Sequence, residues 1–289
     1  MIETHTVPEL GEKVRLQDYA VGIFKTLVSR KGTKKAIKKR RLTINGKLAF
    51  TGDWIHGGEE ISLLEDRLIH LPSTELKLEI LFEDEYMAAV YKPAGILVSG
   101  NKRHTLENAL SSNLSKSKQI DALLKPQPLH RLDYPTTGVL LVGKTANVTM
   151  KLKKMFETRK VEKMYHAVTI GNMENYGEIT SAIDGKQARS EFILREIISS
   201  EKYTALNLVQ LIPHTGRRHQ LRKHLLEIGN PILGDPVYKL ERDKRRGGRL
   251  YLHATAVKFD HPITHESIEV VAPFPKKFIK LFPSLGSSR

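Results

Sequence analysis

Short apolar runs separated by turn residues dominate the chain from about residue 76 onward. Runs of this length match strands, and turn residues between them favour direct strand-to-strand connections over repeated strand–helix–strand units. We therefore expect an α+β fold whose core is a mixed or antiparallel sheet. The runs are Met87–Tyr91, Val139–Val142, Met164–Ile170, Phe192–Leu194 and Ala205–Leu211.

Two segments of this region have the periodicity of helices instead. One covers about residues 147–157 and the other about residues 217–228. In the second, Leu221, Leu225 and Ile228 recur on the face expected to meet the core, and Gly229 follows as a stop signal.

The N-terminal part is marked by its charge. Residues 25–47 hold ten Lys and Arg and no acid, out of a net charge of +15 for the whole chain. Helical spacing of Leu16, Tyr19, Ala20, Ile23 and Leu27 predicts a helix ahead of this run. Thr33 is placed as the N-cap of a second, basic helix, whose expected RNA-contacting side chains are Lys34, Lys35, Lys38 and Arg41.

Turn residues complete a small N-terminal unit. Asn45-Gly46 is typical of a two-residue hairpin turn, and Ile61–Leu64 has the pattern of a strand. The stretch Leu71–Thr74 interrupts the apolar pattern with Pro and small polar residues and predicts a linker. We therefore expect two domains, a small α+β domain over residues 1–70 and a larger one over residues 71–289.

Composition limits the classes of function. The positive surplus on a foldable chain favours a polyanionic partner, nucleic acid before an anionic membrane, and no run approaches the length of a spanning helix. The start lacks the pattern of a secretory signal, and the absence of cysteine excludes disulfides, thiolate zinc sites and cysteine nucleophiles. We expect a cytoplasmic monomer.

The densest polar cluster is His130-Arg131-Leu132-Asp133-Tyr134-Pro135-Thr136-Thr137-Gly138, which runs directly into the apolar strand at Val139. A strand end can hold a carboxylate rigidly, as nucleophilic or general-base chemistry requires. The plainer interpretation is a turn in which Asp133 binds the amides of Thr136 or Thr137. The residues alone leave both interpretations open.

A second cluster, Thr215 to His224, opens the helix predicted at 217–228. Arg218 and Arg222 lie four apart, so both guanidinium groups can reach one cleft, where they would hold a carboxylate ionised or bind a phosphate. The alternative is a solvated basic face. His214, His219 and His224 recur every five residues and cannot share a helix face, which argues against a metal site.

Together the two clusters resemble the RluA family of RNA pseudouridine synthases. The match runs in order over about residues 76–275. It comprises Glu83-Asp84-Glu85 with Lys92-Pro93-Ala94-Gly95, His130 to Lys144, Thr215 to Asp235, and Leu252-His253-Ala254 with Phe259-Asp260-His261-Pro262. Thr137 stands where the family more often has Ser and keeps the hydroxyl. Residues 12–65 resemble more loosely the alpha-L RNA-binding domain shared with ribosomal small-subunit protein four.

The resemblance implies an enzyme that isomerises uridine to pseudouridine in ribosomal or transfer RNA, without cofactor or metal. It assigns Asp133 as nucleophile or base, acting on the ribose or the uracil, with Arg222 as its partner. Tyr165 would stack on the base and help to move the C5 proton. Arg131 would enter the RNA stack, Leu221 would form the wall beneath the tyrosine, and His130 would contact substrate. A flipped-out base costs least from loops and bulges.

Two other classes of function stay open. One is an RNA-binding or ribosome-assembly protein on the same fold that catalyses nothing. The joint presence of Asp133, Tyr165 and Arg222 argues against it, because a carboxylate in a basic RNA groove repels phosphate. The other is a glycosidase-like hydrolase, which needs two carboxylates flanking one bond, and no second acid lies near Asp133 in sequence.

Overall fold

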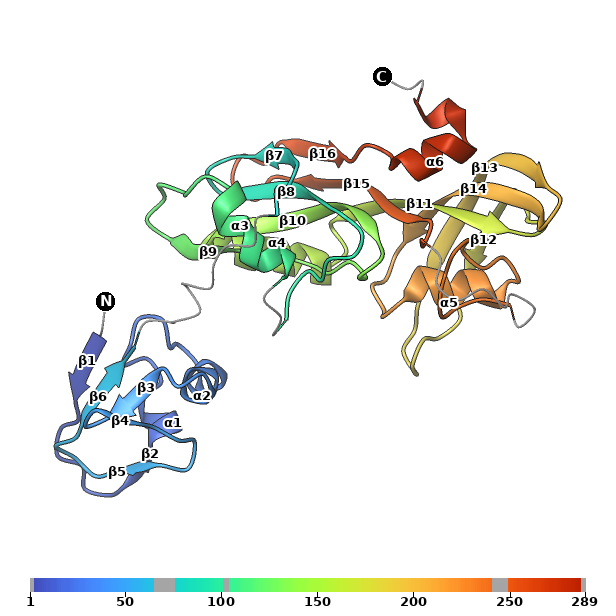
Figure 1. Cartoon of the computed structure of the whole chain (residues 1–289). Helices are drawn as coiled ribbons and strands as arrows, with labels where there is room; N and C mark the ends of the chain where they lie inside the picture. The colour runs from blue at the N-terminus through green and yellow to red at the C-terminus, as the bar shows by residue number, and fades with distance from the viewer. Residues whose placement is uncertain (1–2, 65–75, 101–103, 241–248, 287–289) are drawn as a thin grey trace. The chain divides into compact units, whose positions relative to one another are not determined.

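The chain divides into two compact units, Met1–Pro72 and Ser73–Arg289, which we call the small unit and the large unit (Figure 1). The computed structural model describes residues 3–64, 76–100, 104–240 and 249–286. The predicted linker at residues 71–74 lies outside the described residues. Each unit has its own apolar core.

The small unit combines short strands with two helices. A four-stranded sheet has the order β1-β6-β3-β4, and β2 pairs with β5 in a separate ribbon. The elements are β1 (Glu3–Thr6), β2 (Val14–Arg15), α1 (Leu16–Tyr19), α2 (Arg30–Lys38), β3 (Leu42–Ile44), β4 (Lys47–Leu48), β5 (Trp54–Ile55) and β6 (Glu60–Leu63).

Both predicted helices of the small unit differ in extent from the expectation. The first ends at Tyr19 instead of continuing to Leu27, since the chain turns through Gly22, whose φ of +78° is unfavourable for other residues. The apolar spacing is still used, because Leu16 and Leu27 are both buried. The N-cap of α2 is Ser29, which accepts a hydrogen bond from the Gly32 amide at 3.1 Å, so Thr33 was wrongly placed as the cap.

The predicted hairpin at Asn45-Gly46 is confirmed. Ile44 pairs with Lys47, and the two turn residues between them have φ values of 48° and 76°, as a turn that suits the twist of a hairpin requires.

A ten-stranded sheet, antiparallel except for one strand pair, forms the centre of the large unit, which confirms the predicted α+β class. Its main path is β12-β13-β14-β11-β15-β10-β8-β7, while β16 pairs with β15 and β9 with β10. The strands are β7 (Ile80–Glu83), β8 (Met87–Lys92), β9 (Ala122–Pro128), β10 (Thr137–Thr145), β11 (Glu162–Ile170), β12 (Tyr176–Ile179), β13 (Ser190–Ser200), β14 (Thr204–Pro213), β15 (Leu252–Asp260) and β16 (Ser267–Val271).

Helices cover both faces of this sheet. They are α3 (Leu106–Asn113), α4 (Ala146–Glu157), α5 (Gln220–Glu227) and α6 (Lys276–Leu281), followed by a 3₁₀ turn at Pro283–Gly286. Alternate residues of β10 face opposite sides: Leu140 joins the apolar cluster that contains α3, whereas Leu141 joins the cluster that contains α4. The same holds farther along the sheet for α5 and α6.

The helix predicted at 147–157 is confirmed as α4, and the helix predicted at 217–228 is shorter than expected. Leu221 and Leu225 are buried, but Ile228 lies after the last helical residue and is 37 % exposed, so its predicted core position was wrong. Gly229 ends the helix with a φ of +80°, as predicted. Within the part of the chain that is described, no helix is long and apolar enough to cross a membrane.

The parallel strand pair of the large sheet, β10 with β15, fixes the loop that precedes β10. Thr137 pairs with His253 and Gly138 with Ala254. Gly138 has a φ of +119°, and a Cβ atom there would lie 2.0 Å from the Ala254 carbonyl oxygen. Only glycine allows the two strands to approach so closely, which explains the Gly at the end of the polar cluster 130–138.

Candidate active site

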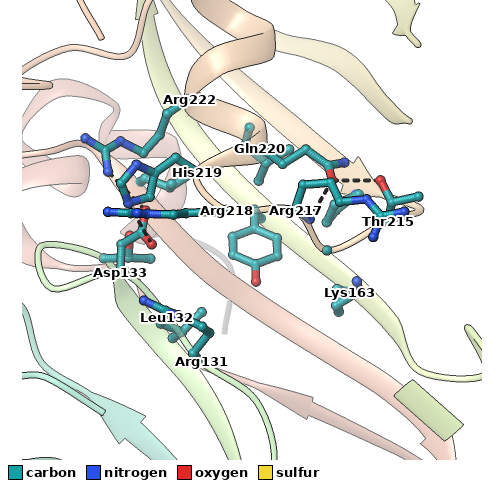
Figure 2. Close-up of a pocket in the computed structure, with 16 residues that line it drawn as sticks. Arg131, Leu132, Asp133, Lys163, Thr215, Arg217, Arg218, His219, Gln220 and Arg222 are labelled. Atoms are coloured by element: carbon teal, nitrogen blue, oxygen red, sulfur yellow. Dashed lines mark hydrogen bonds and ion pairs between the residues drawn. The ribbon is translucent and has the colours of Figure 1, made fainter. Parts of the chain in front are cut away.

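A pocket of about 340 Å³ opens where the β9–β10 loop, β11 and the start of α5 meet. Figure 2 shows Asp133, His219 and Arg222 on one side of this pocket and Lys163 and Thr215 on the other. The two polar clusters predicted from the sequence, 130–138 and 215–224, therefore line the same pocket although they are far apart along the chain.

The backbone and the side chain of Asp133 have different partners. Its carbonyl accepts a hydrogen bond from the Thr136 amide at 3.0 Å, so its backbone forms a turn. Its carboxylate instead faces the pocket, where Oδ2 accepts a hydrogen bond from Arg222 Nη1 at 3.1 Å. The side chain is 18 % exposed, which leaves it within reach of a substrate.

The buried side chain of Lys92 holds the loop that carries Asp133. It is fully buried at the end of β8, and its Nζ donates hydrogen bonds to the carbonyls of Pro93, Tyr134 and Thr136 at 3.0, 3.2 and 2.8 Å. Burial lowers the pKa of Lys92 to about 8, against the opposing effect of the Asp133 charge. Three carbonyls on one ammonium group make the loop around Asp133 rigid.

Arg222 is held by a second carboxylate. Its Nε and Nη2 atoms donate to the two oxygens of Asp235 at 2.6 and 2.8 Å, while the side chain of Asp235 is completely buried. Although burial opposes its charge, the hydrogen bonds with Asp235 and Asp133 raise the pKa of Arg222. The guanidinium group thus remains a fixed positive charge beside Asp133.

His219 is the second group that faces Asp133. Its Nε2 lies 3.6 Å from Asp133 Oδ1, and its Nδ1 lies 2.9 Å from the hydroxyl oxygen of Tyr238. The residue has a φ of 56°, in the left-handed region, which is uncommon for residues other than glycine although histidine adopts it more readily than most. Burial lowers the pKa of His219, Asp133 opposes this shift, and Arg222 and Arg218 add to it.

Gln220 ties the loop 215–219 to the start of α5. Its Oε1 accepts hydrogen bonds from the Thr215 hydroxyl at 2.7 Å and from the Arg217 amide at 3.0 Å, as the dashed lines in Figure 2 mark. Its Nε2 donates to the Arg189 carbonyl and the Ser190 hydroxyl. The loop that carries the pocket arginines is therefore anchored to β13.

Tyr165 lies on β11 at a β-bulge. The pairing with β15 shifts between Met164 and Tyr165, and such bulges change the direction of a side chain. Tyr165 packs with Leu221 in one apolar cluster. Burial, followed by the charge of Asp133, raises the pKa of Tyr165, so its hydroxyl stays protonated at neutral pH. The neutral side chain can stack on a base and donate a hydrogen bond.

Several further cations line the pocket. Arg131 is exposed at the start of the loop, and Lys163, Arg217 and Arg218 lie among the other lining residues. Burial and the nearby Arg159 lower the pKa of Lys163. A concave surface with this many cations around one carboxylate suits a polyanion whose reacting group sits at Asp133.

His130 does not lie with these residues. Its Nε2 accepts a hydrogen bond from the Leu141 amide at 3.0 Å, and its ring lies 4.9 Å from that of Phe156. Burial, and then the charge of Lys163, lower its pKa to about 4. The neutral ring therefore fastens the start of the loop to β10, and the expected contact of His130 with substrate finds no support in this position.

The predicted basic side chains of the small unit lie on and just after α2. Lys35 and Lys38 are exposed, whereas Lys34 is half-buried. Arg41 is also half-buried, and its Nε donates to the Leu64 carbonyl at 3.1 Å, so it supports the unit's own fold.

Sequence reasoning missed Asp235, His219, Tyr238 and the role of Lys92. Asp235 and His219 stood within the quoted motifs, but nothing in their spacing shows that they meet Arg222 and Asp133. Tyr238 lies three residues beyond Asp235 and carried no motif signal. Over the residues that are described, no group of three or more His, Asp or Glu side chains is placed to hold a metal ion.

Comparisons with known proteins identify the family of the chain. The RNA pseudouridylate synthase family profile matches residues 86–227. Ribosomal large subunit pseudouridine synthase D of Pseudomonas aeruginosa is 31% identical over 97% of this chain and 94% of its own length. tRNA pseudouridine synthase C of Vibrio vulnificus is 33% identical over 71% of this chain and 94% of its own length.

A solved structure, Human RNA Pseudouridylate Synthase Domain Containing 1, superposes with a TM-score of 0.59 at 25% identity, covering 74% of this chain and 88% of that one. The sequence and the fold therefore indicate the same family. The chain belongs to the RluA family of RNA pseudouridine synthases, which isomerise uridine to pseudouridine within RNA.

Proposed function

We propose that this enzyme modifies uridine in ribosomal large-subunit RNA, with Asp133 as the residue that reacts with the nucleotide. The proposed role of Asp133 is supported by the position of its carboxylate, which is partly exposed in a basic pocket and bound by a buried arginine. A protein that only bound RNA would gain nothing from a carboxylate at this point, because it repels phosphate.

The choice of RNA rests on how far the relatives extend. Similarity to the large-subunit synthase covers 97% of this chain and so includes most of the small unit. Similarity to the transfer RNA synthase covers 71% of this chain but nearly all of that relative, which leaves no room in it for a comparable extra unit. A shared second unit favours a shared class of substrate. Ribosomal large-subunit RNA is therefore the proposed substrate, and transfer RNA is the alternative.

The reaction breaks the bond between N1 of uracil and C1′ of ribose and forms a bond from C5 to C1′. N1 gains a proton and C5 loses one, so the isomerisation is balanced without a redox step. Asp133 either attacks C1′ or acts on the uracil ring, and both routes need an ionised carboxylate at a fixed position. Arg222, clamped by Asp235, supplies the fixed counter-charge.

The neighbouring residues fit a flipped-out nucleotide. Tyr165 offers a ring for stacking on the base, supported by Leu221 from behind. Arg131 is exposed at the pocket edge, a suitable position to take the place that the flipped base leaves in the RNA. Since Tyr165 stays protonated, we assign it stacking and a hydrogen bond from its hydroxyl, and not the removal of the C5 proton.

The small unit is proposed to be an RNA-binding domain of the alpha-L type. Lys35 and Lys38 present their charges to solvent from α2 and would contact backbone phosphates together with Lys34 and Arg41. The proposal also keeps the expected cytoplasmic location and monomeric state. Light scattering of the purified protein would test the monomer directly.

The test uses two RNA probes with the full-length enzyme, unmodified large-subunit ribosomal RNA transcribed in vitro and unmodified transfer RNA transcripts. Pseudouridines are then mapped by chemical labelling and reverse transcription. We expect modification at one or a few uridines of the ribosomal transcript. Modification of transfer RNA alone would reject the choice of RNA, whereas turnover by an Asp133→Asn variant would reject the role of Asp133.

A further inference from the structure

His219 belongs to a closed ring of contacts around the reacting carboxylate. Arg222 binds Asp133 on one side and Asp235 on the other. Asp235 Oδ1 also accepts the backbone amides of Val237 and Tyr238, both at 2.9 Å. Tyr238 then contacts His219 through its hydroxyl, and His219 returns to Asp133. Each member of this ring fixes the position of the next.

The two oxygens of Asp133 have different partners. Arg222 Nη1 holds Oδ2 at 3.1 Å, and His219 Nε2 faces Oδ1 at 3.6 Å. Contacts on both oxygens fix the plane of the carboxylate, whereas one contact alone would let it rotate about its Cβ–Cγ bond. At 3.6 Å the His219 contact is electrostatic, and hydrogen bonds of catalytic groups often shorten once substrate is bound.

Tyr238 selects the form of the imidazole. Neutral histidine carries one N–H, and burial keeps His219 neutral by lowering its pKa. If the Tyr238 hydroxyl donates to Nδ1, the proton of the ring must lie on Nε2, which is the atom that faces Asp133. The Tyr238 ring also lies 4.9 Å from the Arg222 guanidinium, so one residue supports both partners of the carboxylate.

The backbone at His219 supports a functional interpretation. A φ of 56° places a bulky residue in the left-handed region at the N-cap of α5, where its side chain caps nothing. Backbone conformations of this kind are concentrated at functional sites. Here it directs the imidazole toward Asp133 instead of toward the helix.

We propose that His219 is a positioning residue that orients the Asp133 carboxylate through its Nε2–H, with Tyr238 setting the tautomer. This inference rests on the proposed role of Asp133 in the reaction. It assigns no proton transfer to His219. The charged and titratable groups around the imidazole are Asp133, Arg222, Arg218, Asp235 and Tyr238.

Two substitutions separate this role from a structural one. In His219→Asn the amide oxygen can still accept a hydrogen bond from Tyr238, but the amide cannot reach Asp133, and Asn tolerates the left-handed backbone. In His219→Gln the longer amide restores a donor near the position of Nε2. We expect the single-turnover rate on the ribosomal transcript to fall about 10-fold to 100-fold for Asn and less than about fivefold for Gln, with RNA affinity nearly unchanged in both.

His214→Asn is the matched control, because His214 belongs to the same segment but pairs with Glu191 at 2.8 Å and does not line the pocket. It should react at the parent rate. An Asn variant at position 219 as fast as the parent, or a Gln variant as slow as Asn, would overturn the proposal.

A measurement without RNA distinguishes failure of this inference from failure of the proposed function. In ¹⁵N NMR spectra of the full-length protein, the His219 ring should show an unprotonated Nδ1 and a protonated Nε2 at neutral pH. Tyr238→Phe, which removes only the hydroxyl, should give a mixture of tautomers. A proton on Nδ1 in the parent protein would contradict the inference, whatever RNA the enzyme modifies.

Discussion

In the small unit Lys35 and Lys38 of α2 lie at the surface, whereas in the large unit Arg222 and Asp235, next to Asp133, are buried and paired with one another. Lys35 and Lys38 are exposed, but Arg222 is only 4 % exposed and Asp235 not at all. Surface cations attract RNA without fixing any atom, and buried pairs fix atoms to within tenths of an ångström. The comparison suggests that affinity and chemistry are supplied by different units and can be changed separately.

The largest expected effect is that of Asp133→Asn, which should abolish turnover without weakening RNA binding. The amide is nearly isosteric but cannot act as nucleophile or base, so turnover should fall by on the order of a thousandfold or more. RNA affinity should stay level or rise, because a negative charge leaves a basic pocket. Single-turnover assays and RNA titrations of the same preparation measure both quantities.

The control for this experiment is Asp260→Asn, which alters an exposed carboxylate at the end of β15. It should change neither rate nor affinity. A parallel loss of turnover and binding in Asp133→Asn would mean that the residue serves the structure of the pocket and not the reaction.

Acid should unfold the large unit before the small one. Burial lowers the pKa values of His130, His166 and His253 to about 4 each. Because these values lie below the unfolded value of about 6.5, the unfolded state takes up the protons first. The stability that comes from keeping these histidines neutral is fully present above about pH 6.5 and is lost as the pH falls toward 4. The loss in free energy of unfolding approaches about 3 kcal/mol for each histidine.

The chain offers a separate probe for each unit. Its single tryptophan, Trp54, lies in the small unit, so its fluorescence reports on that unit alone. Hydrogen exchange of peptides from β10 and β14 reports on the large unit. The described histidines of the small unit, His5 and His56, are half-buried and exposed, so its acid transition should lie at lower pH. Coincident transitions would show that the units do not unfold separately.

Asp235→Asn should have the next largest effect. The change leaves buried Arg222 with one anionic partner instead of two and weakens the bidentate contact that orients it. We expect turnover to fall about 10-fold to 100-fold and the large unit to lose about 3 kcal/mol of stability, as for other broken buried ion pairs. Urea unfolding followed by far-UV circular dichroism measures the stability, and a full-rate variant would show that Arg222 needs only Asp133.

The sequence predicted much of this arrangement because local patterns carry it. The apolar runs predicted the strands, Asn45-Gly46 predicted the hairpin, and Gly229 predicted the end of α5. Prediction failed where an element's extent depends on contacts between distant parts of the chain, or on a turn that the local sequence does not signal. The helix begun at Leu16 stops early because the chain turns at Gly22, and no periodicity of apolar residues reveals that.

The site shows the same limit. The motifs pointed to Asp133 and Arg222, but their spacing could not reveal that Asp235 clamps the arginine or that Tyr238 meets His219. The hydrogen bond from Leu141 to His130 is equally invisible in sequence, since it depends on the pairing of the loop start with β10. A residue within a motif can thus serve the scaffold while its neighbour serves the reaction.

The smallest expected effect concerns the small unit alone, in full-length Lys34→Gln/Lys35→Gln/Lys38→Gln protein. If all three lysines contact phosphates, the slope of log affinity against log salt should shrink by about two, at about 0.7 for each contact with single-stranded RNA. Turnover at saturating RNA should not change, because the pocket is untouched.

The matched control carries Gln at Lys202, Lys258 and Lys276, three exposed lysines of the large unit outside the pocket. Both variants lose the same net charge, so a slope that falls equally in both would assign the effect to overall charge and reject the small unit as an RNA-binding domain. Trp54 fluorescence verifies that the small unit of the triple variant is still folded.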